Sequence, residues 1–182
     1  LNIDNVEISY PRQDGGTGSV AYIAPGASAS LNGGTIGSAG GSAYSFPEYG
    51  GAFYVDAGAS FDMTGGSIIG FVAQKDGGAV YNLGDFTMTG GSITNCRSLG
   101  EHKDSGSGEY TEPGKGGGVA NFGYMTLGGS ASTANISACY AISHIQDTYG
   151  LGGGVYQPKL ADSETKYRLM VSGNPMVMGN IV

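Results

Sequence analysis

The residues GGAVYNLGDFTMTGGSITNC (77–96) alternate apolar and polar side chains in three short segments, VYN, FTM and SIT. Alternation with a period of two indicates β-strands. The residues between the segments, LGD and TGG, are typical of tight turns, because glycine adopts positive φ without steric cost. Three strands this short cannot bury their apolar side alone. The pattern therefore predicts strands that stack on other segments of the same kind.

Two phrases of this segment recur along the chain. The first occurs as GSVAY (18–22), GGAFY (50–54), GGAVY (77–81), GGGVA (116–120) and GGGVY (152–156). The second occurs as SLNGGTI (30–36), DMTGGSI (62–68), TMTGGSI (87–93) and, in degraded form, MVSGNPM (170–176). Self-similarity at such intervals predicts stacked repeats. Each repeat would form one coil whose strands pair in parallel with those of the next coil, about 4.8 Å away.

Like positions of successive coils would superpose, so the core can be predicted as columns of apolar residues. The first column would contain Ala21, Phe53, Val80, Val119 and Val155. The second would contain Leu31, Met63, Met88, Leu127 and Val171. The third would contain Ile36, Ile68, Ile93, Ile136 and Met176. Asn82 and Asn121 also share one position, which predicts a structural ladder of stacked amides.

The phrases GGGVY and F-x-M-x-G-G-x-I, clearest at 50–69 and 77–96, resemble the glycine-rich right-handed parallel β-helix repeats of bacterial surface and adhesin-like proteins. The resemblance covers roughly residues 18–180 and implies an extracellular location, secreted or on a bacterial cell surface. The predicted fold is all-β: a single-stranded, right-handed parallel β-helix, or solenoid, of about five coils with loop insertions. We expect one domain over residues 1–182, as a piece of a longer secreted surface protein.

Composition excludes several classes of partner. Eight Lys and Arg against 15 Asp and Glu give a net charge of −7, which is the wrong sign for gripping nucleic acid or anionic lipid. No apolar run approaches the length of a bilayer span, so we expect no membrane insertion within this segment. A hydrophobic share of 40% is too high for a disordered chain.

Three insertions fall between the third strand of one coil and the first strand of the next: 38–49, 97–115 and 140–151. A fourth, 157–168, leaves from a different turn. Loops at one turn of a repeat in register emerge along one edge, where solenoids usually bind partners. The alternative is that they are merely tolerated surface loops. The candidate contact residues in these insertions are Glu101, His102, Asp104, Tyr110, His144 and Asp147.

Imidazole and carboxylate groups of this kind suit zinc. However, the chain has none of the usual ligand spacings, such as H-x-x-x-H or C-x-x-C. We therefore predict no metal and no cofactor, with solvated loop residues as the interpretation of His102 and His144.

A further candidate surface is the column Tyr22, Tyr54, Tyr81 and Tyr156, which Ala120 interrupts. If the preceding residues point inward, alternation turns the tyrosines outward, where a ladder of rings offers a platform for sugars. Stacking between strands without any ligand is the structural alternative. The opposite phase, with the tyrosines inside, also stays open.

Cys96 and Cys139 share a column, three residues beyond Ile93 and Ile136. Adjacent coils would bring their Cα atoms to about 5 Å, which permits a disulfide. A bridge and a pair of inward thiols stacked beside Phe71 are both open at this point.

These observations favour a non-catalytic cell-surface module, an adhesin or stalk, that contacts a host protein or a glycan through its inserted loops. The alternative is a polysaccharide-active enzyme, because pectate lyases and polygalacturonases also use parallel β-helices. Glycoside hydrolysis needs two carboxylates in one groove, and elimination needs a base with calcium. Acidic residues in this chain cluster in loops and not at matched strand positions, so we predict no catalytic residues.

Overall fold

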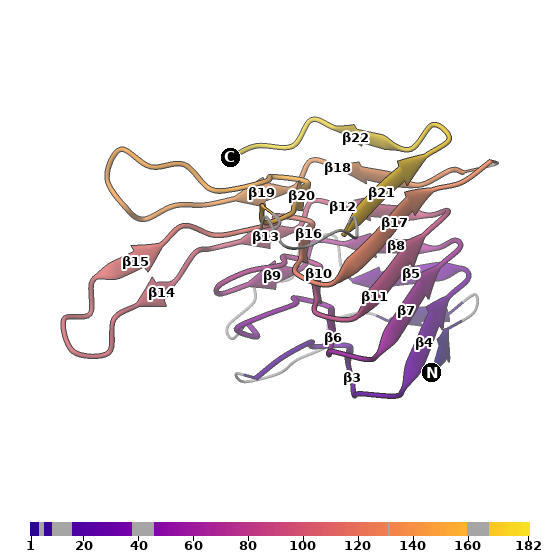
Figure 1. Ribbon diagram of the computed structural model, residues 1–182, viewed down its shortest axis with the longest axis horizontal. Coiled ribbons are helices and arrows are strands. Elements are labelled where there is room, and N and C mark those ends of the chain that lie inside the picture. Colours follow the sequence, from indigo (N-terminus) through magenta and orange to yellow (C-terminus); the bar gives the residue numbers. More distant parts are fainter. Residues whose placement is uncertain (4–5, 9–15, 38–45, 131, 160–167) are drawn as a thin grey trace.

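The computed structural model describes residues 1–3, 6–8, 16–37, 46–130, 132–159 and 168–182. In this part of the chain all regular structure is β-strand, and there is no helix. Short strands lie side by side in several parallel sheets (Figure 1). Within the described ranges there is accordingly no helix that could cross a membrane.

Three parallel sheets contain most of the strands. The first six-stranded sheet contains β1 (Asn2–Ile3), β4 (Ser28–Leu31), β7 (Ser60–Met63), β11 (Asp85–Met88), β17 (Tyr124–Gly128) and β21 (Leu169–Ser172). The second contains β2 (Val6–Ile8), β5 (Gly34–Gly37), β8 (Ser67–Ile69), β12 (Ser92–Thr94), β18 (Asn135–Ser137) and β22 (Met176–Met178). The five-stranded sheet contains β3 (Ala21–Ile23), β6 (Phe53–Val55), β10 (Val80–Asn82), β16 (Val119–Asn121) and β20 (Val155–Tyr156).

Two smaller sheets complete the structure. A parallel three-stranded sheet contains β9 (Val72–Ala73), β13 (Arg97–Ser98) and β19 (Tyr140–Ala141). An antiparallel hairpin contains β14 (His102–Lys103) and β15 (Tyr110–Glu112). The hairpin lies inside the predicted insertion 97–115 and was not expected from the sequence.

The chain visits the sheets in the same order in every repeat. It passes from the five-stranded sheet to the first and then the second six-stranded sheet, as in β6, β7 and β8, and returns with β10, β11 and β12. Neighbouring strands in each sheet thus come from successive repeats, as the phrases predicted, and the arrangement is compatible with a solenoid. Strands β1 and β2 add a further layer before the first glycine phrase.

Pairing registers confirm the predicted columns with one correction, but the core does not extend into the last layer, where Val171 is 61% exposed. Val80 lies beside Phe53 and Val119, and Ile93 beside Ile68 and Ile136. The side chains in the middle of each column are fully buried, and they form one apolar cluster.

The prediction that Met176 ends the third column is wrong, because Val177 pairs with Ile136. Four residues separate Met88 from Ile93, but five separate Val171 from Val177. The degraded last phrase is therefore one residue longer, which shifts its register.

The two glycines of each pair are required for different structural reasons. Gly77 has φ +69°, in the left-handed region that side chains avoid. Gly78 lacks that constraint, but a Cβ there would lie 2.0 Å from the carbonyl oxygen of Gly117 in the next repeat. The first glycine makes the turn, and the second lets two backbones approach.

A buried amide ladder runs beside the core, as predicted. Asn82 Nδ2 donates to Asn121 Oδ1 at 2.6 Å, and Asn121 Nδ2 donates to Gln157 Oε1 at 2.5 Å. The same two amides also donate to the backbone oxygens of Tyr124 and Arg168. Because both asparagines are fully buried, these bonds offset the cost of removing the amides from water.

Two predicted insertions leave the stack later than expected, because their first residues, Arg97–Ser98 and Tyr140–Ala141, are strands β13 and β19 of the three-stranded sheet. Segments 97–115 and 140–151 both follow strands of the second six-stranded sheet, and 157–159 follows the five-stranded sheet instead. Parts of the other insertions, 38–45 and 160–167, lie outside the described residues.

Candidate functional site

The predicted tyrosine column lies in register on the outer face of the five-stranded sheet. Tyr54 pairs with Tyr22 on one side and Tyr81 on the other. Phe53 and Val80, which precede two of these tyrosines, are fully buried, whereas Tyr22 is 51% exposed and the other two are half-buried. The outward phase is therefore correct and the inward phase is wrong.

Phe122 fills the gap that Ala120 leaves in this column. Ring centroids are 5.5 Å apart for Tyr22 and Tyr54, and 5.2 Å for Tyr54 and Tyr81. Phe122 continues the series at 5.2 Å from Tyr81 and 5.6 Å from Tyr156. The sequence analysis missed Phe122, although an aromatic residue two places beyond Ala120 lies on the same side of the chain by alternation.

The rings of this aromatic ladder pack against one another: Tyr54 stacks with Tyr22 and Tyr81, and Phe122 packs at a tilt between Tyr81 and Tyr156. Rings 5.2–5.6 Å apart leave no space for a sugar between them. The hydroxyl of Tyr22, at the end of the ladder, donates to the Asp56 carboxylate, and this bond raises the pKa of Tyr22. Burial, together with the nearby charge of Asp76, raises the pKa of Tyr81. The ladder therefore favours the structural alternative, sheet stabilisation by neutral stacked rings.

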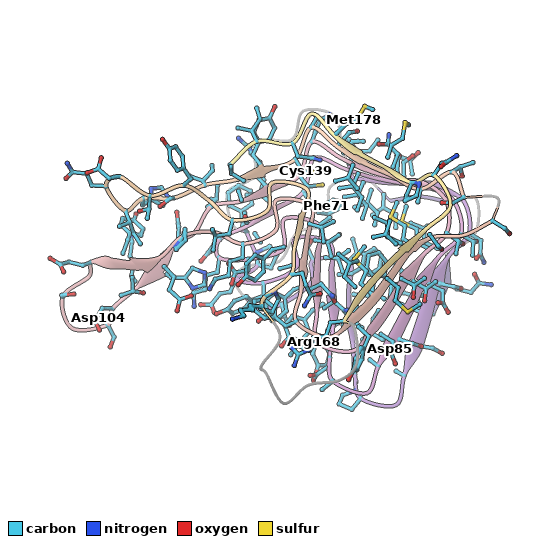
Figure 2. All side chains as sticks on the ribbon, turned by 45° about the horizontal axis from the view of Figure 1, so that its top comes forward. Phe71, Asp85, Asp104, Cys139, Arg168 and Met178 are labelled. Carbon is cyan, nitrogen blue, oxygen red and sulfur yellow. The ribbon has the colours of Figure 1, made fainter. Side chains whose placement is uncertain are left out.

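Two insertions from neighbouring repeats form an arm, by which we mean residues 101–113 and 142–150. Both project to the same side, away from the stacked sheets (Figure 1). Asp104 lies at the far end of the arm (Figure 2), where its Oδ1 accepts the backbone N–H groups of Gly106 and Ser107 at 2.9 and 2.7 Å. These bonds lower the pKa of the Asp104 carboxyl, and they show that this residue closes the turn.

The two parts of the arm contact each other through predicted residues. The rings of Tyr110 and His144 stack with centroids 4.4 Å apart and planes 22° apart. Lys103 Nζ lies 4.9 Å from the centroid of the Tyr110 ring, within cation–π range.

A buried carboxylate anchors the arm to the stack. His102 Nε2 lies 2.9 Å from Asp76 Oδ1, and the same oxygen accepts the backbone N–H of Lys115 at 2.9 Å. The Asp76 side chain is 3% exposed and that of His102 is 13% exposed. Sequence reasoning missed Asp76, because it belongs to the preceding repeat and not to an insertion.

The remaining predicted arm residues have separate positions. Glu101 is half-buried, and its backbone N–H donates to Gln74 at 2.8 Å. Asp147 is an exposed turn residue with φ +59°. His102 and His144 have different partners, and no group of three or more metal-binding side chains occurs in the described ranges.

The two cysteines are free thiols, and both are fully buried. Because Arg97 lies between Val72 and Tyr140 in register, the residues just before them, Phe71, Cys96 and Cys139, form an inward column. Burial raises the pKa of the Cys96 thiol well above its usual range. A buried protonated thiol is a poor nucleophile, so this column packs the core.

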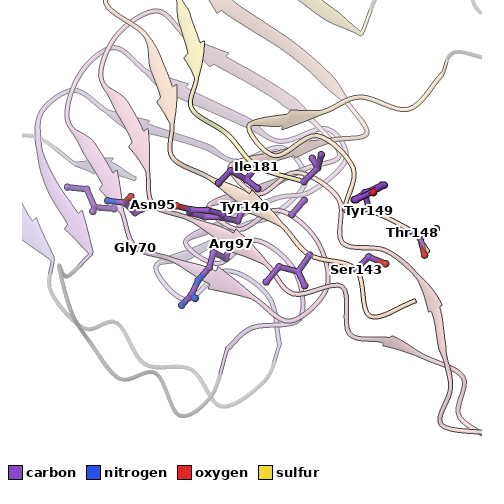
Figure 3. A pocket seen from close by; sticks show the side chains of 13 residues that line it. Gly70, Asn95, Arg97, Tyr140, Ser143, Thr148, Tyr149 and Ile181 are labelled. Atoms are coloured by element: carbon purple, nitrogen blue, oxygen red, sulfur yellow. The ribbon is translucent and has the colours of Figure 1, made fainter. Parts of the chain in front are cut away.

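A groove lies at the base of the arm, over the three-stranded sheet (Figure 3), and encloses about 770 Å³. Arg97 and Tyr140 project into it from paired strands, and Tyr149 borders it from the arm. Its lining residues are Ile69, Gly70, Asn95, Arg97, Tyr140, Ala141, Ile142, Ser143, Thr148, Tyr149, Gly150, Ile181 and Val182. The sequence analysis missed this groove, although Arg97 and Tyr140 each follow an inward cysteine and so must point outward.

Comparison with family models, with curated proteins and with solved structures found no match to this chain.

Proposed function

We propose that the chain is a right-handed parallel β-helix module, secreted by a bacterium or displayed on its surface, that acts without catalysis as an adhesin or stalk. It contacts a host protein or a glycan through the arm. The right hand follows from the chirality preferred by parallel crossovers, and the location follows from the resemblance of the repeats.

The observation that carries this proposal is the ordered arm on a uniform stack. A stack of identical parallel layers gives a stiff platform, and its sheets hold their own side chains in ladders. Against this background, the Tyr110–His144 contact joins two insertions, and the buried Asp76 holds one of them to the sheets. A preorganised projection loses little conformational entropy when it binds a partner.

The arm also has the chemistry of a contact surface. Tyr149, on segment 142–150, is 76% exposed, and the hairpin carries charged residues of both signs, among them Glu101, Lys103 and Asp104. Exposed tyrosines combine large contact area with a polar tip, which is why they are enriched at protein interfaces and in paratopes.

The hairpin can be removed where its two ends meet, with Asp76→Asn in the same chain because the deletion takes away His102, the partner of the buried Asp76 carboxylate. A Cβ on Gly100 would lie 2.4 Å from the backbone nitrogen of Gly114, so the two ends of the hairpin are adjacent. Residues 101–113 can be replaced by a Gly-Ser pair that joins these ends. The matched control is Asp104→Asn with the hairpin intact, which keeps the shape of the tip and removes one charge.

The test is binding to arrays of host matrix proteins and glycans. We expect the shortened chain to lose the binding of the full chain while its thermal unfolding remains cooperative. Equal binding by both chains would refute a role for the hairpin. Release of reducing or unsaturated sugars from acidic polysaccharides, with or without calcium, would refute the non-catalytic role.

A further inference from the structure

We propose that the groove at the base of the arm binds a saccharide unit that carries one carboxylate, such as a uronic or sialic acid, with Arg97 as the anion-binding residue. The inference rests on the proposed function and names a ligand class for one part of that surface. Figure 3 shows the residues concerned, which come from four successive repeats and from the arm.

Charge selects the ligand. Arg97 is exposed, and within the described part of the chain its side chain has no ion-pair partner. It contributes the only charged side chain among the residues that line the groove. A guanidinium pairs bidentately with a carboxylate. A single cation on a chain of net charge −7 matches a singly charged ligand better than a doubly charged phosphate monoester.

Aromatic rings give the groove its affinity for a ring-shaped partner. Tyr140 and Tyr149 line it, and no stacking partner of either ring occurs among the described residues. This distinguishes them from the aromatic ladder, whose ring faces are covered. A tyrosine ring offers an apolar face together with a hydroxyl, which suits the mixed surface of a sugar.

Polar groups at the rim supply partners for sugar hydroxyls. Asn95 is exposed in a turn with φ +55°, where its backbone N–H donates to Ser137 O at 3.3 Å. Its side-chain amide is thus held at the edge of the groove. Ser143 and Thr148 add hydroxyls on the side of the arm. A few fixed polar groups around an apolar floor are typical of ligand sites, and a volume of about 770 Å³ is within their usual range.

The groove does not suit an extended peptide. Peptides commonly bind by adding a strand to a free sheet edge. Here the edge beside β19 is occupied, because Ala141 N–H donates to Ile181 O at 3.0 Å and Ile181 N–H donates to Cys139 O at 2.9 Å. A compact ring lying on Tyr140 needs no such edge.

The experiment titrates ¹⁵N-labelled full chain with methyl galacturonoside, which carries one carboxylate, and with 3′-sialyllactose, and follows backbone amide shifts. The methyl ester of the first sugar and lactose are the neutral counterparts. We expect the shifts to map to Arg97, Tyr140 and Tyr149, and at least tenfold weaker binding of the neutral sugars. The acidic sugar that binds more tightly identifies the source of the carboxylate.

Arg97→Gln should weaken binding of the acidic sugar at least tenfold, because it removes a charge-assisted pair. Tyr149→Ala should weaken it about fivefold. The control Lys159→Gln removes a positive charge from an exposed position outside both the arm and the groove, and it should change binding less than twofold. Amide spectra identical outside the groove show that each variant is folded.

The inference is overturned if neither acid binds at 10 mM, if neutral sugars bind equally well, or if Arg97→Gln binds as the wild type does. Array binding that still depends on the hairpin would then leave the proposed function standing. If array binding does not depend on the hairpin but the acidic sugar still binds, the proposed role of the arm is refuted and the groove remains a saccharide site.

Discussion

Replacing Gly78 by alanine should destabilise the chain far more than the loss of a glycine elsewhere. The added Cβ would lie 2.0 Å from Gly117 O and 2.5 Å from Arg97 N, whereas real Cβ contacts are essentially never shorter than 3.0 Å. The neighbouring repeats must therefore separate by about 1 Å. Both contacted atoms belong to the backbone in the middle of the stack, so no side chain can rotate away to make room.

The magnitude follows from the hydrogen bonds at this point. Gly78 N–H donates to Gly116 O at 3.0 Å, and Gly77 N–H donates to Lys115 O at 2.9 Å, both toward the following repeat. A displacement of about 1 Å breaks both, at about 1 kcal/mol each. Overpacking adds about 1–3 kcal/mol. We expect the free energy of unfolding to fall by about 3–5 kcal/mol, a large part of the total for a domain of this size.

The assay is urea unfolding followed by circular dichroism, with two matched variants. Gly58 has φ +77° but open space around its Cβ position, so Gly58→Ala should cost about 1 kcal/mol from backbone strain alone. Gly106 has neither constraint, and its only close neighbour is a flexible carboxylate at 3.4 Å, so Gly106→Ala should cost less than about 0.5 kcal/mol. A Gly78→Ala variant that loses no more stability than Gly58→Ala would refute close backbone stacking.

Four further predictions concern single sites. Ala138 has φ +52°, so Ala138→Gly should raise the free energy of unfolding by about 1 kcal/mol and shift the urea midpoint upward. An unchanged midpoint would argue against this backbone geometry. The buried hydroxyl of Ser98 has no hydrogen-bond partner in the described ranges, so Ser98→Ala should stabilise the chain by about 1 kcal/mol in the same assay. Asp76→Ala removes the anchor of the hairpin and should speed amide hydrogen exchange over 101–113 at least tenfold, while exchange at an unaltered rate would show that the anchor is dispensable. Because the pKa of the Cys96 thiol is raised, little thiolate is present below that pKa, and the reactivity of Cys96 should grow only as the pH rises through it. A thiol reagent at pH 8 should therefore label neither Cys96 nor Cys139 in the folded chain, and should label both in urea without reductant. A disulfide between them would prevent labelling in urea.

The sequence could predict everything that depends on the repeat itself. Val80 and Ile93 recur at fixed places, so their pairing with Phe53 and Ile68 needed no knowledge of the loops. The same periodicity placed Asn82 beside Asn121 correctly. It was wrong at Met176, where one extra residue in the last turn shifts the register.

Contacts made by the insertions could not be predicted in this way. The pairing of His102 with Asp76, and the stacking of Tyr110 on His144, depend on how each loop folds back across repeats. The length of a loop does not determine the conformation that brings these side chains together. Phe122 likewise joins the aromatic ladder although it lies two residues beyond Ala120, the position that matches the tyrosines in its own repeat.

The amino-acid sequence by itself determined the β-structure, the parallel pairing of successive repeats and the columns of the core, because each follows from local alternation and from the identity of recurring phrases. Only the tertiary structure decided which way the tyrosines face, that the two insertions form one arm, and that Arg97 and Tyr140 border a groove. These features arise where residues from different repeats meet, and the distances between them are set by the stacking of backbones and not by their separation along the chain.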